Sequence, residues 1–175
     1  VAGFLNSFIR HADSVKIANL AQVVNVIAPI LTRGDDLLVQ SIFHAFAMFS
    51  KRRQGTSLRI GLDGPSYDAS THGKTSYIDA SAIIDGELLH VFAVNRSLDE
   101  AAPLEVAVGD REVVALVDAE ILMGPGGKPE AKAATSWEQR DAIASGLWTA
   151  VEVVDGIART ELPALSLLAA TFRLA

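Results

Sequence analysis

The sequence contains no cysteine, which excludes disulfide bonds, thiolate catalysis and cysteine-ligated metals. This absence fits a reducing compartment, and we expect a cytoplasmic protein. No apolar run is long enough to span a membrane. The net charge is −6, and the only basic cluster is the short run Lys51-Arg52-Arg53. We therefore expect neither nucleic acid nor a membrane as a partner.

Patterns that mark metal and cofactor sites are also missing. The four histidines have neither metal-ligand spacing nor a nucleophile partner. His44 lies between apolar neighbours, where a packing role is the simpler interpretation. The run from Gly124 to Lys128 lacks phosphate-loop spacing, and Pro129 follows it in place of Ser or Thr. We expect no metal and no cofactor, and the chain contains no self-contained active site.

The chain begins without Met, and its apolar residues follow a helical period from the first position. They recur at spacings of three and four residues, as Val1, Phe4, Leu5, Phe8 and Ile9. No N-cap residue precedes this pattern. We therefore expect a helix that is already under way and a chain that is part of a longer protein. A chain trimmed close to a domain edge is the alternative.

Residues 1–56 predict a helix, a strand and a second helix. The first helix should end near His11, and the mostly apolar residues 15–24 predict a parallel strand buried on both faces. Residues 27–31 are extended, and residues 33–36 form a turn. Apolar residues from Leu38 to Phe49 mark the second helix, which ends at the basic run 51–53 before Gly55. The basic charges suit the negative end of the helix dipole.

After Gly55 the pattern becomes that of an all-β domain. Turn signals, among them Asp85-Gly86, separate short apolar runs that predict strands. The predicted strands are residues 57–61, 77–84, 87–95, 104–108, 112–122, 149–154, 158–161 and 165–174. Residues 124–146 predict a long loop that Trp137 anchors. So many short strands indicate a β-sandwich or jelly roll.

Two amides, Gln22 and Asn25, interrupt the apolar run. An unpaired buried amide costs about 1–3 kcal/mol, so each should have a partner. The partner is either nearby backbone or a functional group such as a sugar hydroxyl or an active-site carboxylate. If residues 15–22 form a barrel strand, Gln22 lies at its C-terminal end, where the active sites of such barrels are found. Position alone leaves both interpretations open.

This same segment resembles the α-L-arabinofuranosidases of glycoside hydrolase family 51. The resemblance spans most of the chain, with variable loops between similar segments. The similar segments are Ala12-Asp13, Val15-Lys16, Ala21-Gln22-Val23-Val24-Asn25-Val26-Ile27-Ala28-Pro29-Ile30, Ser50, Gly55-Thr56, Tyr77-Ile78-Asp79-Ala80, Phe92-Ala93-Val94-Asn95-Arg96, Ser136-Trp137-Glu138 and Leu162-Pro163-Ala164-Leu165-Ser166. The sequence differs from the family pattern at Leu167, where Trp is common, and in the shorter turn at residues 33–36.

The resemblance implies an α/β plus all-β fold, a (β/α)₈ TIM barrel followed by a jelly-roll β-sandwich. Residues 1–56 would be the last helix–strand–helix segment of the catalytic barrel, and residues 57–175 the C-terminal β-sandwich domain. Some sandwich strands of the family come from the extreme N-terminus. The family's acid/base and nucleophile glutamates lie upstream of residue 1, so the resemblance implies no catalytic residue in this chain. By the same resemblance Gln22 binds the arabinofuranose, while Asn25 has a structural turn partner.

We therefore expect part of a retaining, exo-acting α-L-arabinofuranosidase that releases terminal L-arabinofuranosyl residues from arabinoxylan or arabinan oligosaccharides. The chain alone should be inactive, and the full-length enzyme should form a homo-oligomer. The alternative is a non-catalytic β-sandwich module for carbohydrate binding or oligomerisation. A carbohydrate-binding module needs exposed aromatic residues, and the chain has only two Trp and two Tyr.

Overall fold

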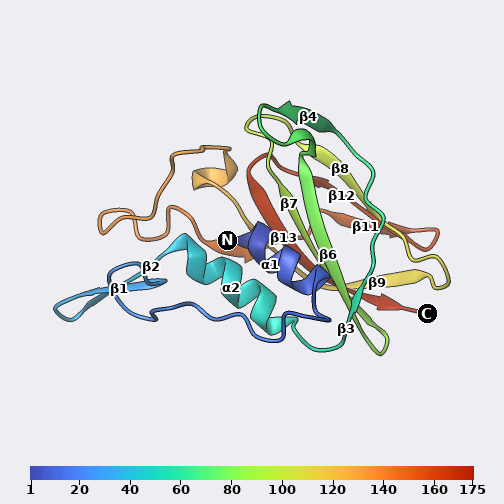
Figure 1. Cartoon of the computed structure of the whole chain (residues 1–175), viewed down its shortest axis with the longest axis horizontal. Coiled ribbons are helices and arrows are strands. Elements are labelled where there is room, and N and C mark those ends of the chain that lie inside the picture. Colours follow the sequence, from blue (N-terminus) through green and yellow to red (C-terminus); the bar gives the residue numbers. More distant parts are fainter.

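The computed structural model describes all 175 residues. Two β-sheets and two helices form most of the molecule (Figure 1). The larger sheet has six strands in the order β10-β9-β13-β7-β6-β3. Its strands are β3 (Thr56–Leu58), β6 (Ile78–Asp85), β7 (Leu88–Asn95), β9 (Val113–Leu122), β10 (Ser145–Leu147) and β13 (Ser166–Leu174).

The smaller sheet has three strands in the order β11-β12-β8 and lies against one face of the larger sheet. Its strands are β8 (Ala102–Val106), β11 (Val151–Val154) and β12 (Ile157–Leu162). The helices α1 (Ala2–Arg10) and α2 (Ser41–Lys51) lie on the opposite face of the larger sheet (Figure 1). Two separate hairpins complete the fold: β1 (Ile30–Arg33) with β2 (Asp36–Val39), and β4 (Ser66–Ala69) with β5 (Gly73–Ser76). Neither helix has the length and apolar composition that a membrane span requires.

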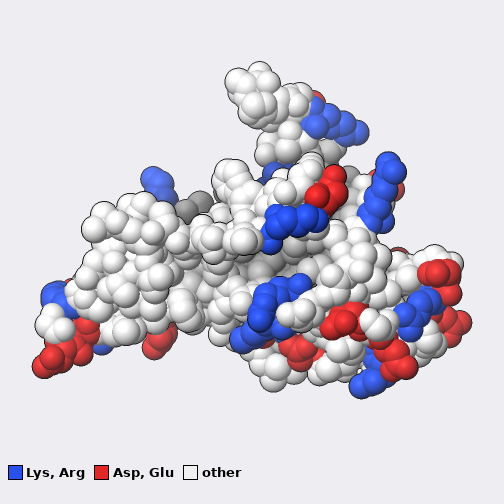
Figure 2. All heavy atoms as spheres, turned by 60° about the horizontal axis from the view of Figure 1, so that its bottom comes forward, with Lys and Arg blue, Asp and Glu red and all other residues white.

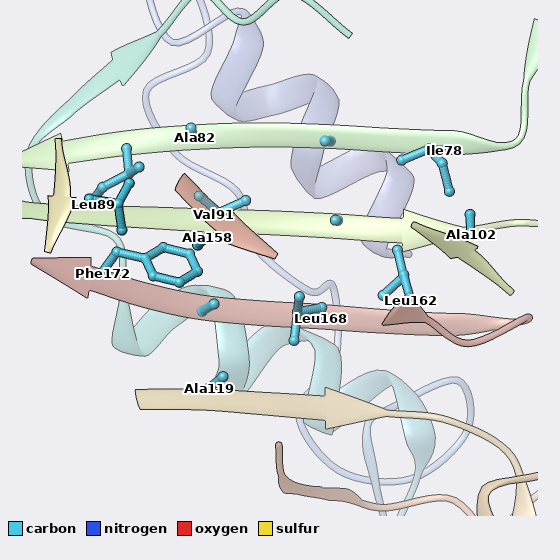
Figure 3. Close-up of a cluster of buried hydrophobic side chains, with 14 of the residues drawn as sticks. Ile78, Ala82, Leu89, Val91, Ala102, Ala119, Ala158, Leu162, Leu168 and Phe172 are labelled. Carbon is cyan, nitrogen blue, oxygen red and sulfur yellow. The ribbon is translucent and has the colours of Figure 1, made fainter. Parts of the chain in front are cut away.

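The central strands of the larger sheet are buried on both faces. In β7, Leu89 and Val91 face the smaller sheet, whereas Phe92 faces the helices. Figure 3 shows the first of these two cores, where Leu168 and Phe172 of β13 lie among residues of β6, β7 and the smaller sheet. This two-sided burial explains why β13 is apolar almost throughout and shows no simple alternation.

Helix α1 is fixed to β6 by polar contacts as well as by apolar packing. The side chain of Asn6 is fully buried and donates to the backbone oxygen of Asp79 at 3.1 Å and to its carboxylate at 3.0 Å. The hydroxyl of Ser81 donates to Asn6 Oδ1 at 2.7 Å. Arg10 forms an ion pair with Asp79 at 2.9 Å. Each of these polar groups therefore has a partner, which is the condition for burying an amide without a large cost.

Helix α2 is fixed to the sheet by one stacked aromatic pair and one buried arginine. Phe49 stacks on Phe92 of β7 with ring centroids 4.1 Å apart. Arg52, which is only 3% exposed, pairs with the carboxylates of Asp118 and Glu120 on β9. Its Nε donates to the hydroxyl of Thr171 at 3.2 Å, and its Nη1 donates to the last turn of α2. The guanidinium thus donates a hydrogen bond to a carbonyl at the end of α2 and connects this helix to strands β9 and β13.

The position of Arg52 corrects the prediction for the basic run. Arg53 does donate to the helix carbonyl of Ser50 at 2.7 Å, as a dipole interaction requires. Lys51 instead pairs with Glu120 at 2.7 Å, and Arg52 enters the interface with the sheet. The acidic partners lie about seventy residues away in the sequence, so helix-end statistics could not reveal them.

The predicted all-β pattern after Gly55 is confirmed, and the eight predicted strands correspond to β3, β6, β7, β8, β9, β11, β12 and β13. The Asp85-Gly86 hairpin joins β6 and β7 as predicted. The β4–β5 hairpin and β10 were missed, and of the β1–β2 hairpin only the turn at residues 33–36 was predicted. The second helix begins at Ser41 and not near Leu38, because Leu38 pairs with Leu31 in the β1–β2 hairpin. The β4–β5 hairpin consists mostly of polar residues, so it has no apolar alternation to detect.

Replacing Arg52 should destabilise the fold. We expect Arg52→Met to lower the free energy of unfolding by about 2–3 kcal/mol, because Asp118 and Glu120 lose their cation within a partly buried site. Urea unfolding of the chain measures this change. The control is Arg173→Met, which removes an exposed pair with Glu87 and should cost less than about 0.5 kcal/mol. Equal losses for the two variants would contradict the role given to Arg52.

His90 should make stability depend on pH. Burial, reinforced by the nearby Arg52 guanidinium, lowers the pKa of His90 below its ordinary value, against weaker opposing effects of Asp85 and Asp118. The unfolded chain therefore binds a proton more readily than the folded chain, and stability falls as the pH drops below about 6.5. We expect His90→Gln to reduce the slope of unfolding free energy against pH between about pH 7 and 5. Identical slopes in the parent and the variant would refute this.

Candidate functional site

The segment that carries the two amides is an irregular, exposed chain and not a buried strand. Residues 15–20 have no regular structure, and the sheet contact of the region is a single parallel bridge between Val24 and Ile30. Ile17 is 75% exposed and Val26 is 82% exposed. The predicted strand at residues 15–24 is therefore wrong for this structure. A two-face-buried parallel strand needs neighbours on both edges, and none of the described strands runs beside this segment.

Gln22 is exposed, and the side-chain hydrogen bonds of this stretch are made by Asn25 and not by Gln22. The reasoning that a buried amide needs a partner therefore does not apply to it. Its amide oxygen and nitrogen are both free to bind a hydroxyl-bearing ligand, because an amide is both a donor and an acceptor. The structure places this residue in the same exposed stretch as Asn25.

Asn25 is held by a local structural contact. Its Oδ1 accepts the backbone N–H of Thr32 at 2.7 Å, and its Nδ2 donates to the Thr32 hydroxyl at 2.9 Å. Its backbone N–H donates to the Ile30 carbonyl at 2.8 Å, and its φ of 60° lies in the left-handed region that Asn tolerates. Asn25 therefore closes the loop onto β1, which confirms the turn role expected for it.

The base of the β1–β2 hairpin is tied to the same segment. The backbone N–H of Gln40 donates to the Pro29 carbonyl at 2.8 Å, and the Gln40 side chain donates to the Ala28 carbonyl. Ala28 and Pro29 are buried, although residues 21–27 are all exposed. The hairpin and the turn around Asn25 thus form one connected unit that directly precedes α2 in the chain.

The loop between β9 and β10 reaches the tip of this hairpin. The Arg33 guanidinium carbon lies 4.4 Å from the ring centroid of Trp137, and that of Arg140 lies 5.5 Å from it. Arg140 also pairs with Asp36 at 2.9 Å. Trp137 therefore anchors the loop, as the sequence indicated. Its partners on the hairpin were missed, because Asp36 and Arg140 are 104 residues apart and no sequence signal links them.

An apolar cleft of about 450 Å³ lies between α1, α2 and the start of the exposed segment. Its walls include Phe8, Phe46 and Ile17. The other residues that the sequence analysis considered do not gather at this cleft or around Gln22. His44 contacts Ser145 at 3.3 Å and Phe43, and burial lowers its pKa, as fits a packing residue. The structure brings no three His, Cys, Asp or Glu side chains into a metal-binding group.

Comparison with known proteins then decides the family. A sequence model of the α-L-arabinofuranosidase C-terminal domain matches residues 1–166, a range that includes Gln22, Asn25 and the whole β1–β2 hairpin. The chain belongs to this family. Membership makes the β-sandwich with two helices the expected architecture of this domain, and the observed sheets agree with it.

Individual relatives support the same assignment. The intracellular exo-α-(1→5)-L-arabinofuranosidase of Streptomyces lividans is 41% identical over 116 residues, which are 65% of this chain and 18% of that protein. The corresponding enzyme 1 of Bacillus subtilis is 41% identical over 103 residues, which are 57% of this chain and 21% of that protein. The family 51 α-L-arabinofuranosidase structure from Bifidobacterium longum superposes with a TM-score of 0.86 and 25% identity, over 98% of this chain and 34% of that one. This arabinofuranosidase C-terminal domain thus spans about a fifth to a third of these relatives.

The contact of Asn25 with Thr32 can be tested by amide exchange. Asn25→Ala removes the acceptor for the Thr32 N–H, so we expect this amide to exchange about tenfold faster through local opening. Asn25→Asp keeps an acceptor oxygen at this position and should retain most of the protection. Hydrogen exchange read by NMR measures both variants. Equal protection of Thr32 in the Ala variant and the parent would contradict the closing role of Asn25.

Proposed function

We propose that this chain is the C-terminal part of a retaining, exo-acting α-L-arabinofuranosidase, in which Gln22 helps to bind the terminal arabinofuranose. The observation that carries the proposal is the family match over residues 1–166, which includes the segment around Gln22. The exposure of the Gln22 amide, with no partner inside the chain, supports a role toward a ligand. In such an enzyme the amide would accept and donate hydrogen bonds to the sugar hydroxyls and orient the ring.

In this proposal residues 1–56 are the last segment of a catalytic (β/α)₈ barrel. The exposed apolar side chains favour this assignment, because Val23, Val24 and Ile27 would otherwise remain in water. Figure 2 brings forward the lower side of Figure 1, along which this segment runs, and a broad area in the left half of that view is free of charged side chains. Neighbouring barrel strands and helices would cover these residues and supply the edges that a parallel strand needs.

Residues 57–175 are then the jelly-roll β-sandwich of the same enzyme. The smaller sheet has three strands against six in the larger sheet, and β8 forms one of its edges. Beside β8 lies an apolar groove of about 410 Å³, bordered by Leu58, Ala82 and Val106. A strand from another part of the longer chain would pair with β8 and fill this groove, as the resemblance to family 51 implies.

The reaction itself would be carried out by two glutamates outside this chain. One would protonate the leaving oxygen and the other would attack the anomeric carbon to form a covalent intermediate. Gln22 would hold the sugar while this happens, without exchanging a proton. We therefore expect the isolated 175 residues to release no arabinose.

The names of the relatives support a proposal for the substrate class and the compartment. The Streptomyces lividans and Bacillus subtilis proteins are intracellular exo-α-(1→5)-L-arabinofuranosidases, and a Bifidobacterium longum relative is an exo-α-(1→6)-L-arabinofuranosidase. We propose by analogy that this enzyme removes terminal L-arabinofuranosyl residues from arabinan or arabinoxylan oligosaccharides in the cytoplasm. We further propose that it forms a homo-oligomer, which sedimentation of the full-length enzyme would test.

The test is Gln22→Ala in the full-length enzyme, with a chromogenic aryl α-L-arabinofuranoside as substrate. We expect kcat/KM to fall about 10- to 100-fold, because lost hydrogen bonds to a sugar hydroxyl weaken transition-state binding. The thermal midpoint should be nearly unchanged, because Gln22 would lie at the open end of its strand and its side chain is exposed within residues 1–175. Gln54→Ala, which removes another exposed glutamine, is the matched control. Unchanged kinetics for Gln22→Ala would remove this residue from the sugar site.

A further inference from the structure

The tip of the β1–β2 hairpin is held by charged and aromatic contacts from a distant part of the chain. Arg140 pairs with Asp36 at 2.9 Å and donates to the Leu37 carbonyl at 3.4 Å. Trp137 lies against the Arg33 guanidinium at 4.4 Å. Figure 1 shows the hairpin and the β9–β10 loop projecting from the same end of the molecule. The loop is rooted at both ends in the larger sheet, so these contacts connect the β-domain to the hairpin.

The charges in this contact are complementary. Arg33 and Arg140 bring two positive charges to one indole ring, and Asp36 supplies a negative charge at the hairpin turn. Glu138 is fully exposed, and its pKa is lowered by its own backbone N–H and by the Ser136 hydroxyl, with a smaller contribution from Arg33. The Glu138 carboxylate, next to Trp137, is therefore negatively charged and attracts the Arg33 guanidinium.

The hairpin in turn fixes the backbone that carries Gln22. Thr32 lies next to Arg33 in β1, and its N–H and hydroxyl both bond to the Asn25 side chain. Val24, two residues after Gln22, bridges to Ile30 at the start of the same strand. The Gln22 side chain has no contact of its own to position it. Within residues 1–175, its location therefore depends on backbone contacts that pass through β1.

We propose that Trp137 and Arg140 act as a positioning clamp, in which the β-domain holds the β1–β2 hairpin and thereby sets how tightly Gln22 binds the sugar. This rests on the proposed role of Gln22. The indole is half-buried and already contacts two guanidiniums, so it holds the hairpin and does not serve as a stacking surface for substrate. Trp137 and Arg140 are positioning residues, because they act through Asn25 and Thr32 and touch no reacting atom.

The first experiment measures the clamp in the 175-residue chain by hydrogen exchange. Trp137→Ala and Arg140→Ala should each speed exchange in residues 30–39 about tenfold, because the hairpin opens more often. Trp137→Phe, which keeps an aromatic face for Arg33, should restore most of the protection. The matched control is Arg159→Ala, which removes a similar exposed ion pair with Glu105 on the smaller sheet and should leave the hairpin unchanged. Unchanged exchange in residues 30–39 for both clamp variants would overturn the proposal.

The second experiment measures the consequence in the full-length enzyme with an aryl α-L-arabinofuranoside. We expect Trp137→Ala to raise KM about three- to tenfold with a smaller change in kcat, because sugar binding is loosened and the reacting groups are untouched. In a double-mutant cycle, Trp137→Ala should add little to Gln22→Ala, because both act through the same amide. Trp137→Phe should recover most of the affinity, and Arg159→Ala should behave as the parent.

The outcomes separate the clamp from the proposed binding role. If Gln22→Ala impairs binding and Trp137→Ala does not, the clamp is overturned and the role of Gln22 stands. Fully additive losses would also overturn the clamp, because they would mean that Trp137 acts independently of Gln22. A silent Gln22→Ala variant would overturn both the binding role and the clamp that rests on it.

Discussion

Burial of the larger sheet on both faces is the constraint on which the other features of this fold depend. Strands β7 and β13 lie at its centre, with the smaller sheet against one face and both helices against the other. Neither cover is large: three strands lie on one face and two short helices on the other. The smaller sheet and the helices must therefore be held in place by specific contacts, since the apolar area that each buries contributes only modestly to the free energy of unfolding.

Buried polar contacts supply that specificity for the helices. Asn6 fixes the rotation of α1 above β6, and Arg52 fixes the end of α2 above β9 and β13. An apolar face alone would allow either helix to slide, whereas a buried amide or guanidinium is satisfied in one arrangement only. The position of α2 then determines where the β1–β2 hairpin leaves the body. The location of the candidate sugar-binding segment thus follows from contacts made far from it.

The exposed segment between the helices combines features that seldom occur together. It is rich in valine and isoleucine, yet most of its side chains lie in solvent, and its turn is closed by one asparagine. In the proposed enzyme the apolar side chains would be covered by the barrel, and Gln22 would remain at the open end of a strand. The hydrogen bonds of Asn25 to Thr32 are already complete within this chain, so the turn is closed without any contribution from the proposed barrel.

Local patterns in the sequence determined the ends of α1, the C-terminal end of α2, the Asp85-Gly86 hairpin, the main strands after Gly55 and the turn role of Asn25. Each depends on neighbouring residues, through helical or strand periodicity, glycine conformation or a short-range hydrogen bond. The tertiary structure decided the rest. Continuous apolarity at residues 15–24 indicates burial, but a strand forms only where edge partners exist. The roles of Arg52 and Trp137 depend on residues about seventy to a hundred positions away. Such groups become neighbours only when the chain folds. Ion pairs and cation–π contacts depend on distance in space, so they produce no periodic pattern in the sequence.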